Sequence, residues 1–128
     1  MKARFGFFVV VVCFCLVPIL SAQDAVKVDP KHYKVEFENK RVRVLHAQYG
    51  PHEKSVMHSH PACVIVSMTD QDARFTLPGG KTMERHMKAG EVGWAPAETH
   101  LPENLSDKPL DVILVEMKGG KPGAAKPR

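Results

Sequence analysis

Apolar and polar residues alternate along much of the chain, in short runs separated by turns rich in glycine and proline. Residues 33–38 alternate strictly, and residues 41–49 repeat the pattern after an Asn-Lys turn. Because successive side chains of a strand point to opposite faces, this period of two predicts strands with one buried face. Residues 62–69 are instead apolar or β-branched almost throughout, which is typical of a strand covered on both faces.

The second half of the chain continues in the same way. Further strands are expected at residues 73–77, 81–87, 92–95 and 110–117, while residues 101–105 are either irregular or a short strand. In the last strand Val112, Leu114 and Met117 are expected to face the core. No convincing helical period extends over three turns after residue 22. About seven to nine short strands with Gly/Pro turns predict an all-β fold, an antiparallel sandwich or barrel.

The first 22 residues have the pattern of a secretory signal peptide. A short basic start precedes the apolar run from Phe5 to Leu20, and the small residues Ser21 and Ala22 follow it. An uncleaved anchor helix is the alternative, but the run is short for a membrane span of about 20 residues. We therefore expect an exported protein, periplasmic or secreted, with no stable membrane insertion after cleavage.

The remaining chain is expected to hold one domain. Residues 23–32 are a polar lead-in, residues 33–118 form the β domain, and residues 119–128, which contain no core-forming residue, are predicted to be a disordered tail. A chain of 106 residues can bury one modest core.

Charge and cysteine content argue against a nucleic-acid-binding protein and against a domain stabilised by disulfides. Lys2 and Arg4 are the only charged residues among residues 1–22, so the rest keeps 16 basic and 14 acidic residues, a net charge of +2. This near-neutral balance gives no basis for nucleic-acid binding. Cys63 is the only cysteine after residue 22, so no internal disulfide can form.

Candidate chemistry is concentrated at His58-Ser59-His60. In an extended backbone both imidazoles point to the same face, and neutral imidazole is the commonest nitrogen ligand for first-row metals. Such a pair needs at least one more ligand from elsewhere in the chain. His100, which follows a Gly-x5-Pro element at residues 90–96, is the candidate.

These residues resemble the two motifs of the cupin superfamily. Gly50…His58-x-His60 is similar to the first motif, and Gly90-x5-Pro96…His100-x3-Asn104 to the second, one residue shorter than usual between the proline and the histidine. The motifs and the strands between them cover about residues 35–117. The resemblance implies a small cupin-type jelly-roll β-barrel that holds a metal through His58, His60 and His100. It also implies a homodimer formed by edge-strand pairing.

The chain departs from the family pattern at one ligand. A glutamate three or four residues after the second histidine is usually the fourth ligand, but Val64 or Ile65 stands there, and strand parity predicts that Val64 faces inward. Three neutral imidazoles without a carboxylate suit a divalent transition metal better than Mg²⁺ or Ca²⁺. Fe(II) is favoured, with Zn, Ni, Cu and Mn as alternatives.

Several other polar side chains have both a functional and an ordinary structural interpretation. Glu98 and Glu103 flank His100 and are candidate catalytic acids or bases, although both can also be ordinary solvated loop carboxylates. The remaining histidines are expected in turns or on strand surfaces, with His52 nearest the mouth of the site. Cys63 is expected to be an inert buried thiol. The cavity walls are predicted to be Val64, Val66 and Trp94.

Three functions remain open from the sequence. The first is a non-haem iron dioxygenase-type enzyme that oxidises a small organic molecule, and the same scaffold also suits a metal-assisted isomerase. The second is a non-catalytic module that binds a metal or a small ligand. The third is a metal-free barrel that serves oligomer formation. Fold alone does not choose among them.

Overall fold

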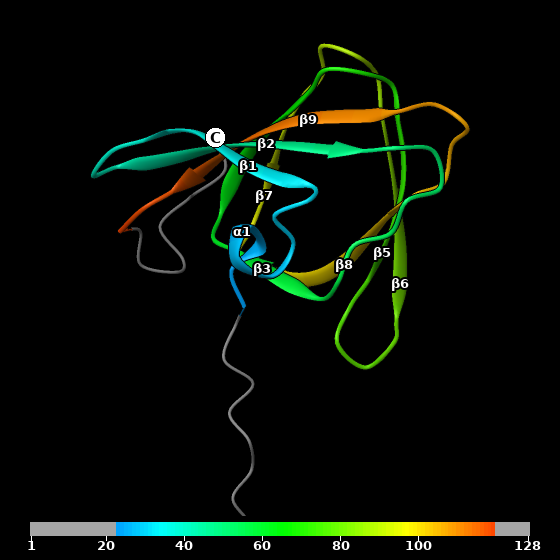
Figure 1. Ribbon diagram of the computed structural model, residues 1–128, viewed down its shortest axis with the longest axis horizontal. Helices are drawn as coiled ribbons and strands as arrows, with labels where there is room; N and C mark the ends of the chain where they lie inside the picture. The colour runs from blue at the N-terminus through cyan, green and yellow to red at the C-terminus, as the bar shows by residue number, and fades with distance from the viewer. Residues whose placement is uncertain (1–22, 120–128) are drawn as a thin grey trace, which may run out of the picture.

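The computed structural model describes residues 23–119, which form two antiparallel sheets facing each other (Figure 1). The expected signal peptide and nearly all of the expected tail lie outside the described residues. The larger sheet contains, in spatial order, β1 (Tyr33–Glu38), β2 (Val42–Tyr49), β9 (Leu110–Met117), β4 (Cys63–Ser67) and β7 (Val92–Ala95). The smaller sheet contains β3 (His58–His60), β8 (Glu98–Asn104), β5 (Gln71–Thr76) and β6 (Thr82–Met87). The antiparallel all-β fold predicted from the alternation is confirmed, and so is the jelly-roll arrangement that the cupin resemblance implies.

The core lies between the two sheets and follows the alternation of the strands. Leu45 is fully buried in β2, and Ile65 and Leu114 are buried opposite each other in β4 and β9. Ala73 and Phe75 face them from β5 of the smaller sheet. Burying each large apolar side chain contributes about 1.5–3 kcal/mol, which makes this interior the main source of stability.

A one-turn helix closes one side of the barrel. α1 (Ala25–Val28) lies beside β1 and β3 (Figure 1), and Asp24 caps it by accepting a hydrogen bond from the Val26 amide at 3.1 Å. The Ser59 amide donates to the Gln23 carbonyl oxygen at 2.7 Å. Residues 23–32, expected only as a polar lead-in, therefore pack directly against the strand that carries two of the three candidate ligands.

Strand parity through β4 is opposite to the prediction. Cys63, Ile65 and Ser67 are buried, whereas Val64 points outward and pairs with Trp94, which is 53% exposed. The expectation that Val64 faces inward and that Val64, Val66 and Trp94 line the cavity was wrong. Pro61 and Ala62 separate β3 from β4, which belong to different sheets, so alternation does not carry over from one strand to the next.

Two further differences concern β8 and β9. β8 begins at Glu98, ahead of the short strand considered at residues 101–105, so His100 lies inside a seven-residue strand. At the end of β9 the buried residue is Glu116, at 1% exposure, while Met117 is only half-buried. Met117 was expected to be inward because it is apolar. Strict alternation from Val112 and Leu114 places Glu116 there instead.

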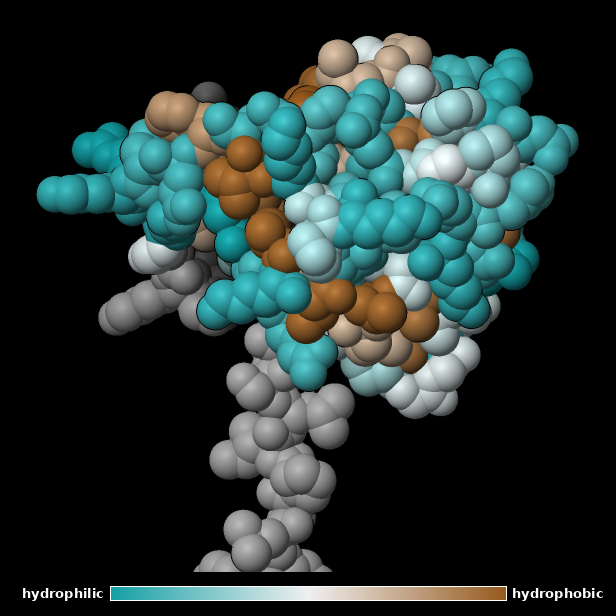
Figure 2. Space-filling model, in the orientation of Figure 1, coloured by the Kyte–Doolittle hydropathy of each residue, from teal (hydrophilic) through white to brown (hydrophobic). Residues whose placement is uncertain are grey.

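The outer surface is mostly polar. Figure 2 shows a hydrophilic face crossed by a narrow band of apolar residues. The most exposed large apolar side chains include Val92 and Trp94 on the edge strand β7. Among residues 23–119, no helix has the length and apolar character needed to cross a membrane.

Candidate metal centre

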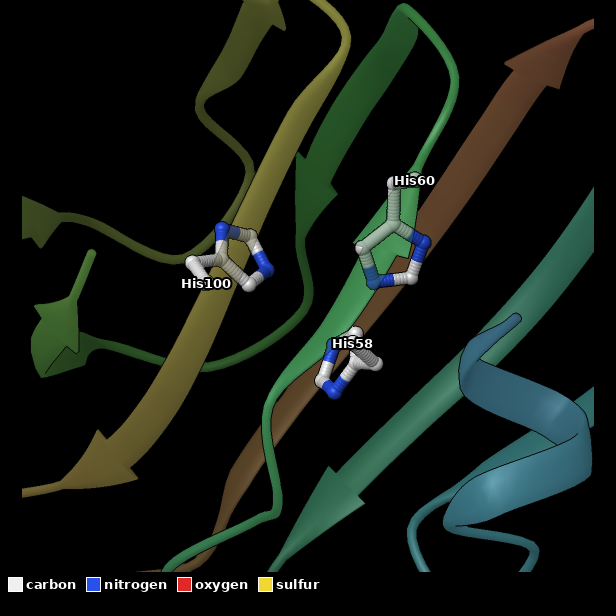
Figure 3. A group of neighbouring side chains, drawn as sticks. All are labelled: His58, His60 and His100. Carbon is white, nitrogen blue, oxygen red and sulfur yellow. The ribbon is translucent and has the colours of Figure 1, made fainter. Parts of the chain in front are cut away.

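Strand pairing brings the three predicted histidines to one point. β3 pairs with β8 in a register that sets His58 opposite His100, while His60 lies two residues further along the same face. One ligand atom from each ring lies within 4.8 Å of the others, and all three side chains are buried. Figure 3 shows the rings converging from the two neighbouring strands. The predicted grouping of His58, His60 and His100 is confirmed.

All three rings have a buried nitrogen with no hydrogen-bond partner among the described residues: Nε2 of His58 and of His60, and Nδ1 of His100. His58 Nδ1 donates to the Val56 carbonyl oxygen at 2.8 Å, and His60 Nδ1 donates to Glu116 Oε1 at 2.6 Å. Because these acceptors take the proton on Nδ1, each neutral ring keeps a lone pair on Nε2. Both Nε2 atoms are buried and have no hydrogen-bond partner among the described residues. A buried polar atom without a partner costs about 1–3 kcal/mol, and a bound metal would remove that cost.

Glu116 is the functional residue that the sequence analysis missed. Its Oε1 accepts from His60, and its Oε2 accepts from Arg43 Nε at 2.6 Å. Arg43 Nη2 in turn donates to Asp24 Oδ2 at 2.5 Å. Carboxylates in this position orient a metal-binding imidazole and raise its basicity. The chain of contacts supplies a negative charge one hydrogen bond from the cluster, although no carboxylate occupies the expected ligand position.

Arg43 and Asp24 hold each other in their ionised forms. Burial tends to lower the pKa of Arg43, but its hydrogen bonds to Asp24 and Glu116 outweigh burial, so that the pKa lies above its usual value. Burial likewise tends to raise the pKa of Asp24, and the hydrogen bond and charge of Arg43 reverse this effect and lower it. Asp24 and Arg43 therefore remain an ion pair across the ordinary pH range.

A second polar network begins beside His58. Ser55 Oγ lies 3.4 Å from His58 Nδ1 and donates to Asp29 Oδ2, and the side chains of Ser55 and Asp29 are both buried. Tyr33 packs edge-on against the His58 ring, with ring centroids 4.9 Å apart. These contacts fix the orientation of His58 from two sides.

The same network continues through His32, which the sequence analysis had expected in a turn or on a strand surface. His32 is 6% exposed, with Nδ1 at 2.7 Å from Asp29 Oδ2 and Nε2 at 3.0 Å from Glu53 Oε2. Its ring stacks on Tyr49 with centroids 4.3 Å apart. Lys31 is the main cause that lowers the pKa of Glu53 to about 2. His32 does lie in a turn, as expected, but its burial was not foreseen, because one of its partners, Glu53, lies 21 residues further along the chain.

A cavity of about 60 Å³ in the barrel interior is lined in part by His60 and His100. Most of its wall is apolar, with Ile65, Phe75 and Leu114 among the contributing side chains. Cys63 also lines it, and burial raises the pKa of the thiol to about 11, which keeps it protonated and unreactive near neutral pH. His52, expected at the mouth of the site, is exposed and bonds to Asp107 at 2.6 Å instead.

The two candidate catalytic carboxylates occupy different environments. Glu98 Oε1 is buried, has no hydrogen-bond partner among the described residues, and lies 3.5 Å from His100 Nδ1. Glu103 Oε2 lies 4.0 Å from Arg74, and the Arg74 side chain is well exposed. Glu98 is thus the carboxylate placed beside the histidine cluster. A catalytic role for either residue stays a prediction.

The comparisons with known proteins agree on the fold. No family model matches the sequence, and no curated protein matches it. A cupin domain from Bordetella pertussis Tohama I is 25% identical, with a TM-score of 0.63 over 68% of this chain and 92% of that chain. A conserved protein with a double-stranded β-helix domain from Klebsiella pneumoniae is 22% identical, with a TM-score of 0.53 over 71% of this chain and 78% of that chain.

A third similar structure comes from an archaeon. This cupin family protein from Methanocaldococcus jannaschii has a double-stranded β-helix fold, and it is 18% identical to this chain. Its TM-score is 0.53, over 70% of this chain and 84% of that chain. The resemblance inferred from the two histidine motifs is confirmed at the level of fold. The homodimer expected from it stays a prediction.

Burial of the histidines predicts how stability depends on pH. Burial is the main cause that lowers the pKa of His58 to about 4 and of His100 to about 3, from 6.5. Between these values and pH 6.5 the unfolded chain binds more protons than the folded one. For the metal-free protein, each histidine should lower the free energy of unfolding by roughly 1.4 kcal/mol per pH unit as the pH falls from about 6.5 toward 4.

Urea unfolding of the metal-free protein across this pH range measures the effect. A variant carrying His58→Gln and His100→Gln is the matched control, because glutamine does not titrate. Its stability should change less steeply with pH than that of the wild type. Equal slopes in the two proteins would contradict the assignment of the pH dependence to these two rings.

Proposed function

We propose that this protein, a small single-domain cupin by fold, holds one divalent transition metal through His58, His60 and His100 and acts on a small organic molecule in the adjoining cavity. The observation that carries the proposal is the pair of buried Nε2 atoms, on His58 and His60, that have no hydrogen-bond partner among the described residues. Their Nδ1 atoms are already committed as donors, so the free lone pairs suit a metal rather than another hydrogen bond.

The donor set favours a particular group of metals. Imidazole nitrogens suit Fe, Zn, Ni and Cu better than they suit the hard cations Mg²⁺ and Ca²⁺. Glu116 supports this choice because its carboxylate, hydrogen-bonded to His60, supplies part of the charge that the missing ligand glutamate would supply. Fe(II) remains the favoured ion.

We propose a dioxygenase-type oxidation as the reaction class. A bound divalent metal would supply a Lewis-acidic centre with open positions for small ligands. The apolar wall of the cavity excludes bulk water from these positions, and Glu98, placed beside His100, is the stronger candidate for exchanging a proton with the substrate. Glu103 is the weaker candidate because its carboxylate is directed toward Arg74.

Non-catalytic binding of a metal or small ligand, and metal-assisted isomerisation, are the alternatives. Oxygen consumption by the iron-loaded protein, screened over small organic molecules, separates the dioxygenase-type reaction from both alternatives. Oxygen consumption that depends on iron and on an added substrate supports the dioxygenase-type reaction. Substrate conversion without oxygen consumption would instead support isomerisation.

His60→Ala should abolish metal binding. The substitution removes one of three ligands and leaves the β-sheet circular-dichroism signal unchanged, because two strands and the interior apolar core remain. The metal content of purified, metal-reconstituted protein, measured by elemental analysis, is the readout. His52→Ala is the matched control, since His52 is exposed, bonds to Asp107 and is not part of the histidine cluster; this variant should bind metal like the wild type.

Two results would count against the metal proposal. Less than about a tenth of an equivalent of any transition metal in the reconstituted wild type would end it, because a site built from three neutral imidazoles retains such an ion. Unfolding of His60→Ala would show instead that the histidine stabilises the barrel.

Glu116→Gln should weaken metal binding without removing it. The amide is close in shape to the carboxylate but carries no charge, so the His60 ring loses the partner that raises its basicity. Losing such a partner typically lowers metal affinity 10- to 100-fold. Competition with a chelator of known affinity measures this change. Glu36→Gln, at an exposed position of β1, is the matched control and should leave the affinity unchanged.

We also propose that the protein is exported and that residues 1–22 are removed. Support comes from the basic start and apolar run, and from the contacts that Gln23 and Asp24 make with Ser59 and Arg43. When the full chain is expressed with its own first 22 residues, the mass of the exported protein should correspond to a chain that begins at Gln23. A chain that keeps these residues and stays with the membrane fraction would contradict the proposal.

A further inference from the structure

Arg85 faces the same interior as the three histidines. It lies on β6, where Met83, Arg85 and Met87 are half-buried and the residues between them are exposed. It pairs with Ala73, which is buried in β5. Arg85 lines the cavity together with His60 and His100. A positive charge therefore faces an otherwise largely apolar space.

The Phe75 ring holds this guanidinium close to the cluster. Arg85 Cζ lies 4.7 Å from the Phe75 ring centroid, a cation–π contact that orients the guanidinium plane. The centroid of the His100 ring lies 5.0 Å from the same Phe75 centroid. Arg85 on β6 and His100 on β8 thus pack against the same aromatic side chain, Phe75, from the two strands that flank β5.

Arg85 has no acidic partner within 4.0 Å among residues 23–119. The ion pairs of this part of the chain include Arg43 with Glu116, and Arg74 with Glu84, but none involves Arg85. Of the two carboxylates lining the cavity, Glu98 is nearest His100 and Glu103 is directed toward Arg74. A guanidinium keeps five N–H donors and cannot lose its charge, so a half-buried one with no acidic partner suits an incoming anion.

The size of the cavity limits what this anion is. Its volume of about 60 Å³ is well below the roughly 300–1,000 Å³ of typical drug-sized ligand pockets. One water-sized probe needs roughly 10–15 Å³ on the same measure, so the space holds about four to six non-hydrogen atoms. The walls beyond Arg85 are mainly apolar, which favours a short hydrocarbon chain over a second charged group.

We infer that the cavity takes a short-chain carboxylic acid, whose carboxylate is bound by the Arg85 guanidinium while its other end lies toward His58, His60 and His100. The fork of guanidinium N–H groups matches the two carboxylate oxygens and allows two parallel hydrogen bonds. This assignment rests on the proposed metal site for the function of the acid, but the contact with Arg85 does not require the metal. Arg85 is a specificity-determining residue for the acid group.

Calorimetric titration with propionate and with propionamide tests the inference. The two probes have similar size and shape, but only propionate carries the charge. The wild type should bind propionate roughly 10- to 100-fold more tightly than propionamide, the range expected for hydrogen bonds between ionised partners. Arg85→Met, which matches the neighbouring Met83 and Met87, should lose this preference, and Arg85→Lys should keep part of it.

The controls separate this inference from the metal proposal. Arg41→Met changes an exposed arginine that does not line the cavity, and it should keep the wild-type preference. Each titration is run with metal-loaded and with metal-free protein, and metal content is measured for every variant. If the protein binds no metal but still prefers propionate in a way that depends on Arg85, the metal proposal fails and the inference about Arg85 stands.

Two results would overturn the role of Arg85. One is equal affinity of the folded wild type for propionate and propionamide. The other is an undiminished preference for propionate in Arg85→Met, which would place the carboxylate on another group, such as the metal itself. Circular dichroism confirms that each variant is folded before its titration is interpreted.

Discussion

The antiparallel pairing of β3 with β8 is the interaction on which the candidate site depends. It sets His58 directly opposite His100, and the two-residue period of β3 adds His60 on the same face. A three-residue strand provides few hydrogen bonds of its own, so its position relies on neighbours on both sides. Thr99 contacts Ser59 through their hydroxyl groups at 2.6 Å, and the Gln23 carbonyl accepts the Ser59 amide hydrogen from the other edge.

Buried charged side chains also fix the orientation of the histidine rings. Glu116 is almost completely buried, and a carboxylate in that position is tolerated only when charged partners and hydrogen bonds surround it. His60 and Arg43 fulfil this requirement, and they link the barrel interior to the segment before α1. Removing one partner of such a buried pair typically costs 3–5 kcal/mol, so orientation of the ring and stability of the barrel depend on the same contacts.

The fold and the three histidines could be predicted because each is marked by a pattern of residues close together in the sequence. Alternation marks the strands, and the two motifs identify His58, His60 and His100 without knowledge of their distance. Glu116 was missed because an apolar neighbour, Met117, was taken as the inward residue, although strict alternation pointed to Glu116. Val64 was placed on the wrong face because β3 and β4 belong to different sheets. The isolation of Arg85 could not be predicted, since it depends on where the acidic residues of other strands point.

The contact between Gln23 and Ser59 has a practical consequence for protein engineering. The backbone here forms an extra, one-residue bridge at the edge of the smaller sheet, next to the strand that carries two imidazoles. Any purification tag fused directly before Gln23 would begin at this bridge and bring its own side chains, often histidines, close to the cluster. Affinity tags at that end would thus interfere with measurements of the metal content of the site.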